Sequence, residues 1–266
     1  MHYALPQLYS SKILRAIVEF DLIAEGDTIL IGLSGGKDSL FLTYAMAMVK
    51  ERLKKHFSLR AFTVNPNFSP DFDTEPLRRF SESLHIPFAA QTVDIAAMID
   101  AAEGKSACYT CAFFRRGAIN RYAKEQGCNK IAYAHHNDDA VETLLMSLLY
   151  AGQIQTFAPK TYLDRTDLTV IRPLIYLREE EIREAVHLYG MTPLPSPCPR
   201  DGNTMRQSVK SLIKTLTDEN PLIYPHLAAA LRKNHVGELW PPVQYRKEMA
   251  AKYGVKGWYQ GDNGNR

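Results

Sequence analysis

The sequence predicts an α/β fold: a doubly wound, mostly parallel sheet of five strands with helices on both faces, followed by a short C-terminal helical extension. Short apolar runs alternate with longer segments of helical pattern, which is typical of sheets built from strand–helix–strand units. The runs are continuously apolar, and this indicates strands buried on both faces. With 45% hydrophobic residues in 266, the chain can bury a sizeable core.

The predicted strands are the apolar runs that end at turn residues. The first, TILIGL, is followed directly by the glycine-containing turn SGGKDS, which opens a helical segment. The five strands are expected at residues 28–33, 59–64, 88–95, 130–135 and 169–175.

The predicted helices follow these strands and carry start and stop signals. Pro76 lies in a first turn, and Asn137 is expected to cap the helix that starts at residue 138. Glycines end three of the helices, at Gly127, Gly152 and Gly190. The helices are expected at residues 38–57, 73–84, 113–126, 138–152 and 179–190.

The composition changes after residue 190. A proline-rich loop, TPLPSPCPRDG, comes first and is followed by a basic helical stretch, MRQSVKSLIKTL. We therefore predict an N-terminal segment, an α/β domain, a C-terminal loop with a basic helical segment, and a tail that is expected to be poorly ordered. These parts span residues 1–25, 26–190, 191–245 and 246–266.

Charge and hydropathy exclude few function classes. The net charge of +3 is too small to indicate nucleic-acid binding by itself. The chain begins without a secretory signal, and no apolar stretch approaches the ~18 residues of a membrane span. We therefore expect a cytoplasmic protein with no membrane partner. In that compartment its four cysteines are more often metal ligands or catalytic thiols than disulfides.

The turn SGGKDS, residues 34–39, has the composition of a phosphate-binding loop. It lies between the first strand and the first helix, where backbone N–H groups and the helix dipole favour an anion. Gly35 and Gly36 allow the backbone to approach a ligand closely, and Lys37 adds a positive charge. A Walker A loop is excluded, because Asp38 stands where that motif needs Ser or Thr.

The cysteines suggest a metal centre. Cys108 and Cys111 form a C-x-x-C pair, and Cys198 follows in a loop stiffened by prolines. From the residues alone, a structural zinc site and a [4Fe–4S] cluster are equally favoured. A structural zinc site requires a fourth ligand, and three thiolates would leave one iron of a cluster without a protein ligand. A redox C-x-x-C would leave Cys198 unexplained. Cys128 is interpreted as a small buried hydrophobe.

The string SGGKDS resembles the PP-loop of the N-type ATP pyrophosphatases. The resemblance implies the adenine nucleotide alpha hydrolase-like fold, and a loop that holds the β- and γ-phosphates of ATP. These leave together as pyrophosphate while an oxygen of the substrate is adenylated. Asp38 is then expected to bind Mg²⁺ on the pyrophosphate, because Mg²⁺ prefers carboxylate and phosphate oxygens.

Further motifs make the chain similar to the tRNA 2-thiocytidine synthetases (TtcA-like). These are CYTCAFFRRG, AHHNDD, IRPL and the later cysteine, in the order that the family has. The resemblance implies a [4Fe–4S] cluster on Cys108, Cys111 and Cys198, whose open iron carries sulfide. ATP with Mg²⁺ adenylates the C2 oxygen of a tRNA cytidine, and sulfur then displaces AMP.

Site residues follow from these resemblances. ATP is expected to contact Leu33, Ser34, Gly35, Gly36, Lys37, Asp38, Ser39, Val64 and His135. Catalysis is assigned to Lys37, Asp38 and Asp139, and magnesium to Asp38 and Asp138. RNA is expected on Arg115, Arg116, Arg206 and Lys210. The last two belong, with Lys214, to a basic stripe at helical spacing, the kind that contacts phosphates.

The expected partners are tRNA and an upstream sulfur donor, such as a cysteine desulfurase or free sulfide; a homodimer is kept open. Two other functions are also kept open: a PP-loop sulfurtransferase that acts on a free base or other small molecule, and a lysidine-synthetase-like tRNA ligase. The three cysteines count against the ligase, which needs no cluster. An iron–sulfur sensor would use the cysteines but has no need of Lys37 and Asp38.

Overall fold

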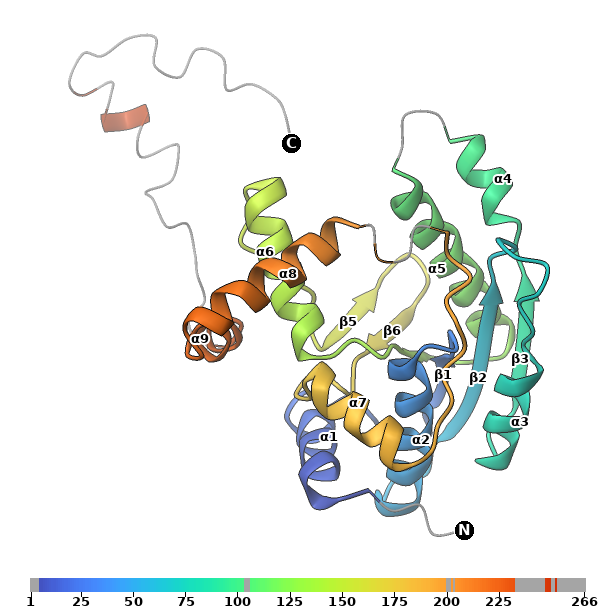
Figure 1. Cartoon of the computed structure of the whole chain (residues 1–266). Helices are drawn as coiled ribbons and strands as arrows, with labels where there is room; N and C mark the ends of the chain where they lie inside the picture. The colour runs from blue at the N-terminus through green and yellow to red at the C-terminus, as the bar shows by residue number, and fades with distance from the viewer. Residues whose placement is uncertain are drawn as a thin grey trace. The chain divides into compact units, whose positions relative to one another are not determined.

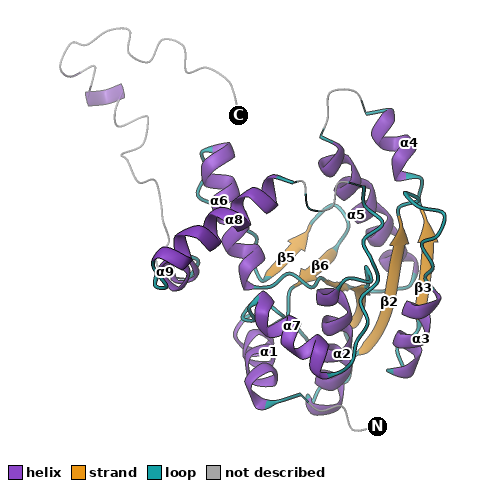
Figure 2. Ribbon diagram, viewed as in Figure 1, coloured by secondary structure: helices purple, strands orange, loops and turns teal. Residues whose placement is uncertain are grey.

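The computed structural model describes residues 5–102, 106–199, 202, 204–232, 247–249 and 252. Contacts divide the chain into two compact units, Met1–Ala228 and Ala229–Arg266. The first contains a sheet of six strands in the order β3-β2-β1-β4-β6-β5 (Figures 1 and 2). The strands are β1 Thr28–Gly32, β2 Ser58–Asn65, β3 Phe88–Thr92, β4 Lys130–Ala132, β5 Lys160–Leu163 and β6 Leu168–Ile171.

Four of the strand pairs are parallel, and the pair of β5 with β6 at the edge is antiparallel. The helices are α1 Gln7–Glu19, α2 Lys37–Arg52, α3 Glu75–Ser83, α4 Ile95–Asp100, α5 Ala107–Glu125, α6 Asn137–Ala151, α7 Glu179–Leu188, α8 Met205–Glu219 and α9 Ile223–Ala230. None of the helices in the described part of the chain combines the length and the apolar character that a membrane span requires.

The core lies between the sheet and the helices that cover it. Helix α2 is buried over most of its length and packs against α1 and α7, in front of the sheet in Figure 1. Helix α5 lies behind the sheet, where Ala118 and Ile119 pack with Leu30, Phe62 and Ile131 of the central strands. The predicted doubly wound arrangement, with helices on both faces, is confirmed.

The sheet differs from the prediction by one strand. All five predicted strands are present, but β5 adds a sixth at the edge. Its sequence, KTYL, is short, and its side chains alternate between exposed and half-buried, so it lacks the apolar run that marked the other strands. It pairs with β6 as a hairpin whose register matches Leu163 to Leu168.

Several boundaries also differ from the prediction. The segment 88–95 ends as a strand at Thr92, because Asp94 accepts a hydrogen bond from the Ala97 N–H at 3.3 Å and begins α4. Helix α5 begins at Ala107 rather than at residue 113, so the C-x-x-C pair lies within its first turns. Helices α1, α4 and α9 were not predicted. The boundary proposed at residue 190 stays a prediction, and the tail 246–266 falls almost entirely outside the described residues.

Asn137 was predicted to cap α6, and this prediction is wrong. The N-cap is His136, and Asn137 is the first residue of that helix. Its side chain is used for tertiary contacts instead. The amide donates to the Ile175 carbonyl at 3.2 Å, and its oxygen accepts from the Tyr224 hydroxyl at 2.9 Å. Gly152 does end α6 in the left-handed conformation, with φ 63°, as glycine permits.

A buried ion pair joins β1 to β4 at their amino ends. Asp27 and Lys130 are 4% and 8% exposed, and their charged atoms lie 2.7 Å apart. Asp27 also accepts from the Ala24 N–H at 2.6 Å and from the Asn129 amide at 2.8 Å. Lys130 donates to the Leu22 carbonyl at 2.9 Å. These bonds fix the separation of the two strands whose opposite ends form the site described below.

Asp27→Ala should lower the free energy of unfolding by about 3 kcal/mol or more, because it leaves the buried Lys130 ammonium unpaired. Denaturant unfolding followed by circular dichroism measures this loss. The double variant Asp27→Asn with Lys130→Met should recover part of it. Lys160→Gln, which removes an exposed pair with Asp21, is the control and should have little effect. If Asp27→Ala lowers the free energy of unfolding by no more than the control does, the stabilising role of the buried pair is contradicted.

Candidate active site

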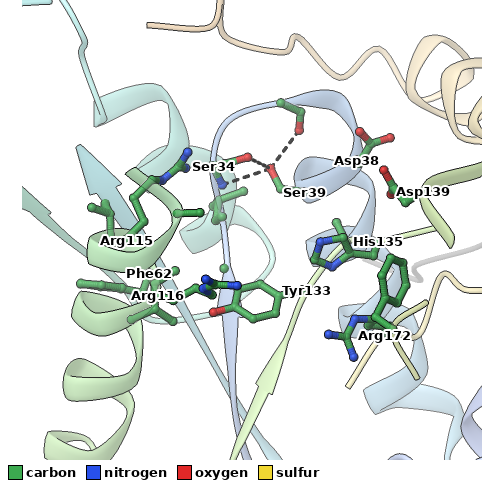
Figure 3. A pocket seen from close by; sticks show the side chains of 18 residues that line it. Ser34, Asp38, Ser39, Phe62, Arg115, Arg116, Tyr133, His135, Asp139 and Arg172 are labelled. Carbon is green, nitrogen blue, oxygen red and sulfur yellow. Dashed lines mark hydrogen bonds between the residues drawn. The ribbon is translucent and has the colours of Figure 1, made fainter. Parts of the chain in front are cut away.

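The turn after β1 is organised around the Ser39 hydroxyl. It accepts hydrogen bonds from the Ser34 N–H and the Ser34 hydroxyl, both at 3.2 Å, and donates to the Gly36 carbonyl at 2.9 Å (Figure 3). Gly35 has φ +89°, which strains any other residue, and a Cβ there would lie 3.3 Å from Leu194. Leu194 also donates its N–H to the Gly35 carbonyl at 2.9 Å. The loop that carries Cys198 is thereby held against this turn.

A cavity of about 520 Å³ opens at the carboxyl ends of the central strands. Most of the residues predicted to bind ATP line it, together with two of the residues predicted to bind RNA. They are Leu33, Ser34, Gly36, Asp38, Ser39, Val64, His135, Arg115 and Arg116, and Asp139, predicted to be catalytic, lines the cavity as well. The strand expected at 130–135 ends at Ala132, so Tyr133, Ala134 and His135 project beyond it into the cavity wall.

Sequence analysis missed part of the lining. Phe62, Ala112, Ile119, Tyr133 and Phe157 were assigned no role, and Arg172 was noted only as part of the IRPL motif. Apolar residues at strand ends and on a helix face carry no signal that separates a cavity wall from the core. Arg172 could have been found, because an arginine directly after a buried strand lies at the carboxyl edge of the sheet, where ligands bind.

Lys37 does not point freely at the cavity. Its ammonium pairs with Asp38 at 3.0 Å and with Glu179 of α7 at 2.9 Å, and Glu179 also binds Lys210 of α8. Burial would raise the pKa of Glu179, but hydrogen bonds from Lys210 and Lys37 hold it at about 2. Burial likewise opposes the charge of Lys37, yet Asp38 and Glu179 raise its pKa. The lysine therefore stays charged, and a phosphate must compete with Glu179 for it.

The neighbouring aspartates have different surroundings. The Nε–H of Arg178 is shared between the two carboxylate oxygens of Asp138, at 3.0 and 3.1 Å, and the Glu179 N–H donates to Asp138 at 2.8 Å. Asp139 lines the cavity with Asp38, and His136 lies between them at 3.4 Å from Asp139 and 3.7 Å from Asp38. The geometry therefore favours Asp139 over Asp138 as the carboxylate that faces a ligand beside Asp38.

The basic stripe on α8 is paired with carboxylates. Arg206 binds Asp139 at 3.0 Å and Glu142 at 3.2 Å, and Lys210 binds Glu179. Lys214 binds Asp218 on the same helix at 2.5 Å. Two of these residues thus hold α8 against the site, so an RNA role for Arg206 and Lys210 stays a prediction. Of the predicted RNA residues, Arg115 and Arg116 are the two that line the cavity.

The three cysteines of the predicted cluster line a second cavity of about 370 Å³. Cys108 and Cys111 come from α5, Cys198 from the proline-rich loop, and all three are free thiols. Burial raises the pKa of Cys111; Arg115 opposes this rise, and the neighbouring Cys198 and Cys108 add to it. Cys128 is buried in the core instead, as predicted.

The two cavities share Ala112 and Arg115 of α5. The turn of residues 34–39 and the three thiols therefore lie on adjoining walls. Within the described residues, no group of three His, Cys, Asp or Glu side chains is arranged to hold a metal ion. In a cluster each thiolate binds a different iron, so its three thiolates stand further apart than ligands of one ion. Three free thiols around one cavity fit that donor set.

Comparison with known proteins gives consistent relatives. The PP-loop domain family matches residues 7–214. A tRNA-cytidine(32) 2-sulfurtransferase of Legionella pneumophila is 37% identical over 221 residues, 82% of this chain and 78% of the relative. One from Anaeromyxobacter sp. (strain Fw109-5) is 34% identical over 251 residues, 93% and 82% of the two chains. The structure of the U34-tRNA thiolase NcsA from Methanococcus maripaludis with its [4Fe-4S] cluster aligns with a TM-score of 0.71 and 19% sequence identity. The alignment covers 89% of this chain and 84% of the thiolase, and it supports the fold.

His135 should remain neutral well below the usual range of histidine. Burial lowers its pKa to about 4, although Asp139 opposes the shift. An unfolded chain protonates this histidine near pH ~6.5, so the unfolded state binds more protons between the two values, and stability falls as the pH drops through that window. NMR titration of the ring, assigned with His135→Gln, measures the value. A midpoint near that of an exposed histidine would show that the ring is not desolvated.

Proposed function

The chain belongs to the PP-loop family that contains the tRNA-cytidine(32) 2-sulfurtransferases, and on this premise we propose that it thiolates cytidine 32 of tRNA. In this reaction ATP activates the C2 oxygen of the base, and sulfur replaces that oxygen. AMP and pyrophosphate are released. Family membership agrees with the resemblance drawn from the sequence motifs.

The proposal is supported by one observation: two cavities lie side by side and share part of their walls. One contains the turn of residues 34–39, and the other contains three free cysteines. A base held between them would meet an activated phosphate on one side and a sulfur source on the other. A tRNA ligase that uses lysine as its nucleophile, or a regulatory ATP binder, has no use for this combination.

Adenylation is assigned to the larger cavity. The cytidine C2 oxygen attacks the α-phosphorus of ATP, and the bond to the β-phosphate oxygen breaks to release pyrophosphate. The hydroxyls of Ser34 and Ser39 now bond within the turn, and they would exchange these bonds for hydrogen bonds to the departing phosphates, together with N–H groups of the turn. Lys37 exchanges its contact with Glu179 for these phosphates, which brings its charge to the leaving group.

Magnesium and the cluster are assigned to the residues whose chemistry fits them. Asp38 and Asp139 supply carboxylate oxygens beside the phosphates, where Mg²⁺ would neutralise the charge of the leaving pyrophosphate. Cys108, Cys111 and Cys198 would hold the [4Fe–4S] cluster, which supplies sulfide as the nucleophile. Binding requires the thiolate form, and Arg115 favours that form at Cys111.

The second step replaces oxygen by sulfur. A C–S bond forms at C2 while the C–O bond breaks, and AMP leaves with the oxygen that the base contributed. Arg115 lies on the wall shared by the two cavities and offers a positive charge to the departing phosphate. The apolar side chains of Phe62 and Ile119 on the cavity wall limit water, which would otherwise hydrolyse the adenylated base.

Lys37→Ala and Asp38→Ala should each reduce AMP formation at least a hundredfold, since each removes charge stabilisation of the leaving pyrophosphate. Release of AMP from ATP in the presence of tRNA measures this. The visible spectrum of anaerobically reconstituted protein should stay as in the wild type, because the turn and the cysteines have separate tasks. Unchanged AMP formation by Lys37→Ala would show that this turn is not the adenylating loop.

Cys198→Ala should abolish 2-thiocytidine while leaving some pyrophosphate release, because the nucleotide turn does not depend on this thiol. The thiolated nucleoside is measured by mass spectrometry of digested tRNA, and iron by metal analysis after anaerobic reconstitution. Cys128→Ala removes a thiol from the core and is the matched control, which should keep both iron and product. Wild-type product from Cys198→Ala would refute the three-cysteine cluster.

A further inference from the structure

Three arginines on the wall of the larger cavity have no carboxylate partner. They are Arg115 and Arg116 of α5 and Arg172, which directly follows β6. The arginine ion pairs found among the described residues involve other arginines, namely Arg15, Arg78, Arg178, Arg183 and Arg206. The cavity therefore presents guanidinium groups whose charge no Asp or Glu of the described chain compensates.

Arg172 is the most enclosed of the three. Its Nη1 donates to the Ala158 carbonyl at 2.5 Å and to the Thr161 hydroxyl at 3.2 Å, and its guanidinium lies 4.8 Å from the centre of the Phe157 ring. Its Nε is buried without a partner. Burial lowers the pKa of Arg172 to about 10. Burying a guanidinium without an anion is costly, and that cost is offset where a ligand brings the anion.

The hydroxyl of Tyr133 lies among these charges. The ring is half-buried, but the oxygen is buried and makes no hydrogen bond. Burial raises the pKa of Tyr133 to about 12, and the nearby charges of Arg116, Arg172 and Arg115 oppose the rise. In Figure 3 Arg116 lies beside the Tyr133 hydroxyl and Arg172 lies on the other side of the ring, below the turn that holds Ser34 and Ser39.

We propose that Arg116, Arg172 and Tyr133, with Arg115 beside them, form a subsite for a phosphate group, separate from the turn of residues 34–39. The inference rests on the proposed function, in which two substrates bring phosphates to this cavity. The phosphodiester next to the target cytidine is the occupant that the observations favour. Arg116 is exposed, so the subsite is open to a polymer, and the turn already provides for the nucleotide phosphates.

The phosphate would complete the contacts that the side chains leave unmade. It would accept hydrogen bonds from Arg116 and from Nη2 of Arg172, and a small movement of the Tyr133 ring would bring its buried hydroxyl into reach. It would also fix the position of the nucleotide that it belongs to, so that the C2 oxygen meets the nucleotide bound at the turn. The α-phosphate of ATP or AMP is the other source of the same chemistry, and binding measurements distinguish the two.

The test compares Arg116→Gln, Arg172→Gln and Tyr133→Phe with the wild type. Arg121→Gln is the matched control, because Arg121 is an exposed arginine of α5 that lines neither cavity. Dissociation constants are measured for unmodified substrate tRNA over a series of salt concentrations, and for a non-hydrolysable ATP analogue. Thermal unfolding shows whether each variant is folded. Arg116 makes no hydrogen bond or ion pair with the described residues, so Arg116→Gln decides the question should Arg172→Gln unfold.

We expect each arginine variant to bind tRNA about tenfold more weakly. The slope of log K against log salt should fall by about 0.7 to 1 for the lost phosphate contact. Tyr133→Phe should bind tRNA a few-fold more weakly, and Arg121→Gln should bind it as tightly as the wild type does. Affinity for the ATP analogue should stay unchanged in all variants.

Two other results have definite meanings. If the variants bind the ATP analogue more weakly and tRNA unchanged, the phosphate subsite is supported, but its phosphate comes from the nucleotide and not from RNA. Wild-type affinity of the three variants for both ligands would overturn the subsite. A wild-type protein that binds tRNA but forms no 2-thiocytidine would refute the proposed function without touching the subsite. If the wild-type protein binds no tRNA, unchanged affinity of the three variants for the ATP analogue would overturn the subsite, and weaker affinity would support it.

Discussion

The site depends on one feature of the sheet topology. From β1 the chain adds β2 and β3 on one side, and it then crosses to the other side of β1 to add β4. Crossover connections are right-handed, so α2, which leads from β1 to β2, and α5, which leads from β3 to β4, must lie on opposite faces of the sheet. The two connections therefore diverge at the carboxyl ends of β1 and β4, and no helix fills the space between them. The buried pair of Asp27 and Lys130 fixes the other ends of these strands. The cavity is a consequence of topology, and the sequence at its rim decides what it does.

Helix α5 connects the two halves of the proposed chemistry. Its first turns carry Cys108 and Cys111, and Ala112 and Arg115 follow on the wall that the two cavities share. One helix thus sets the separation between the thiols and the turn of residues 34–39. The loop with Cys198 completes the second cavity, and it is attached to the turn through the bond from Leu194 to Gly35. Glu179, shared by Lys37 and Lys210, links α2, α7 and α8 around the same point.

The sequence predicted the parts of the structure that have strong local signals. Continuous apolar runs marked the buried strands, and the glycines and serines of the turn, with the C-x-x-C pair, marked chemistry that such residues perform. It failed where the cause is tertiary. Strand β5 depends on its partner β6 rather than on its own apolarity, and Asn137 is used for contacts with Ile175 and Tyr224 that no local pattern reveals. The pairing of Arg206 with Asp139 likewise depends on the packing of α8 against α6.

In the proposed reaction, the oxygen removed from the base is the oxygen that attacks ATP. The decisive experiment uses tRNA that carries oxygen-18 at C2 of the target cytidine, in a single-turnover reaction with ATP and sulfide under anaerobic conditions. Mass spectrometry of the released AMP then locates the label. We expect the AMP to contain one oxygen-18 for each 2-thiocytidine formed. Unlabelled AMP, with the label released into water or retained in the base, would contradict it.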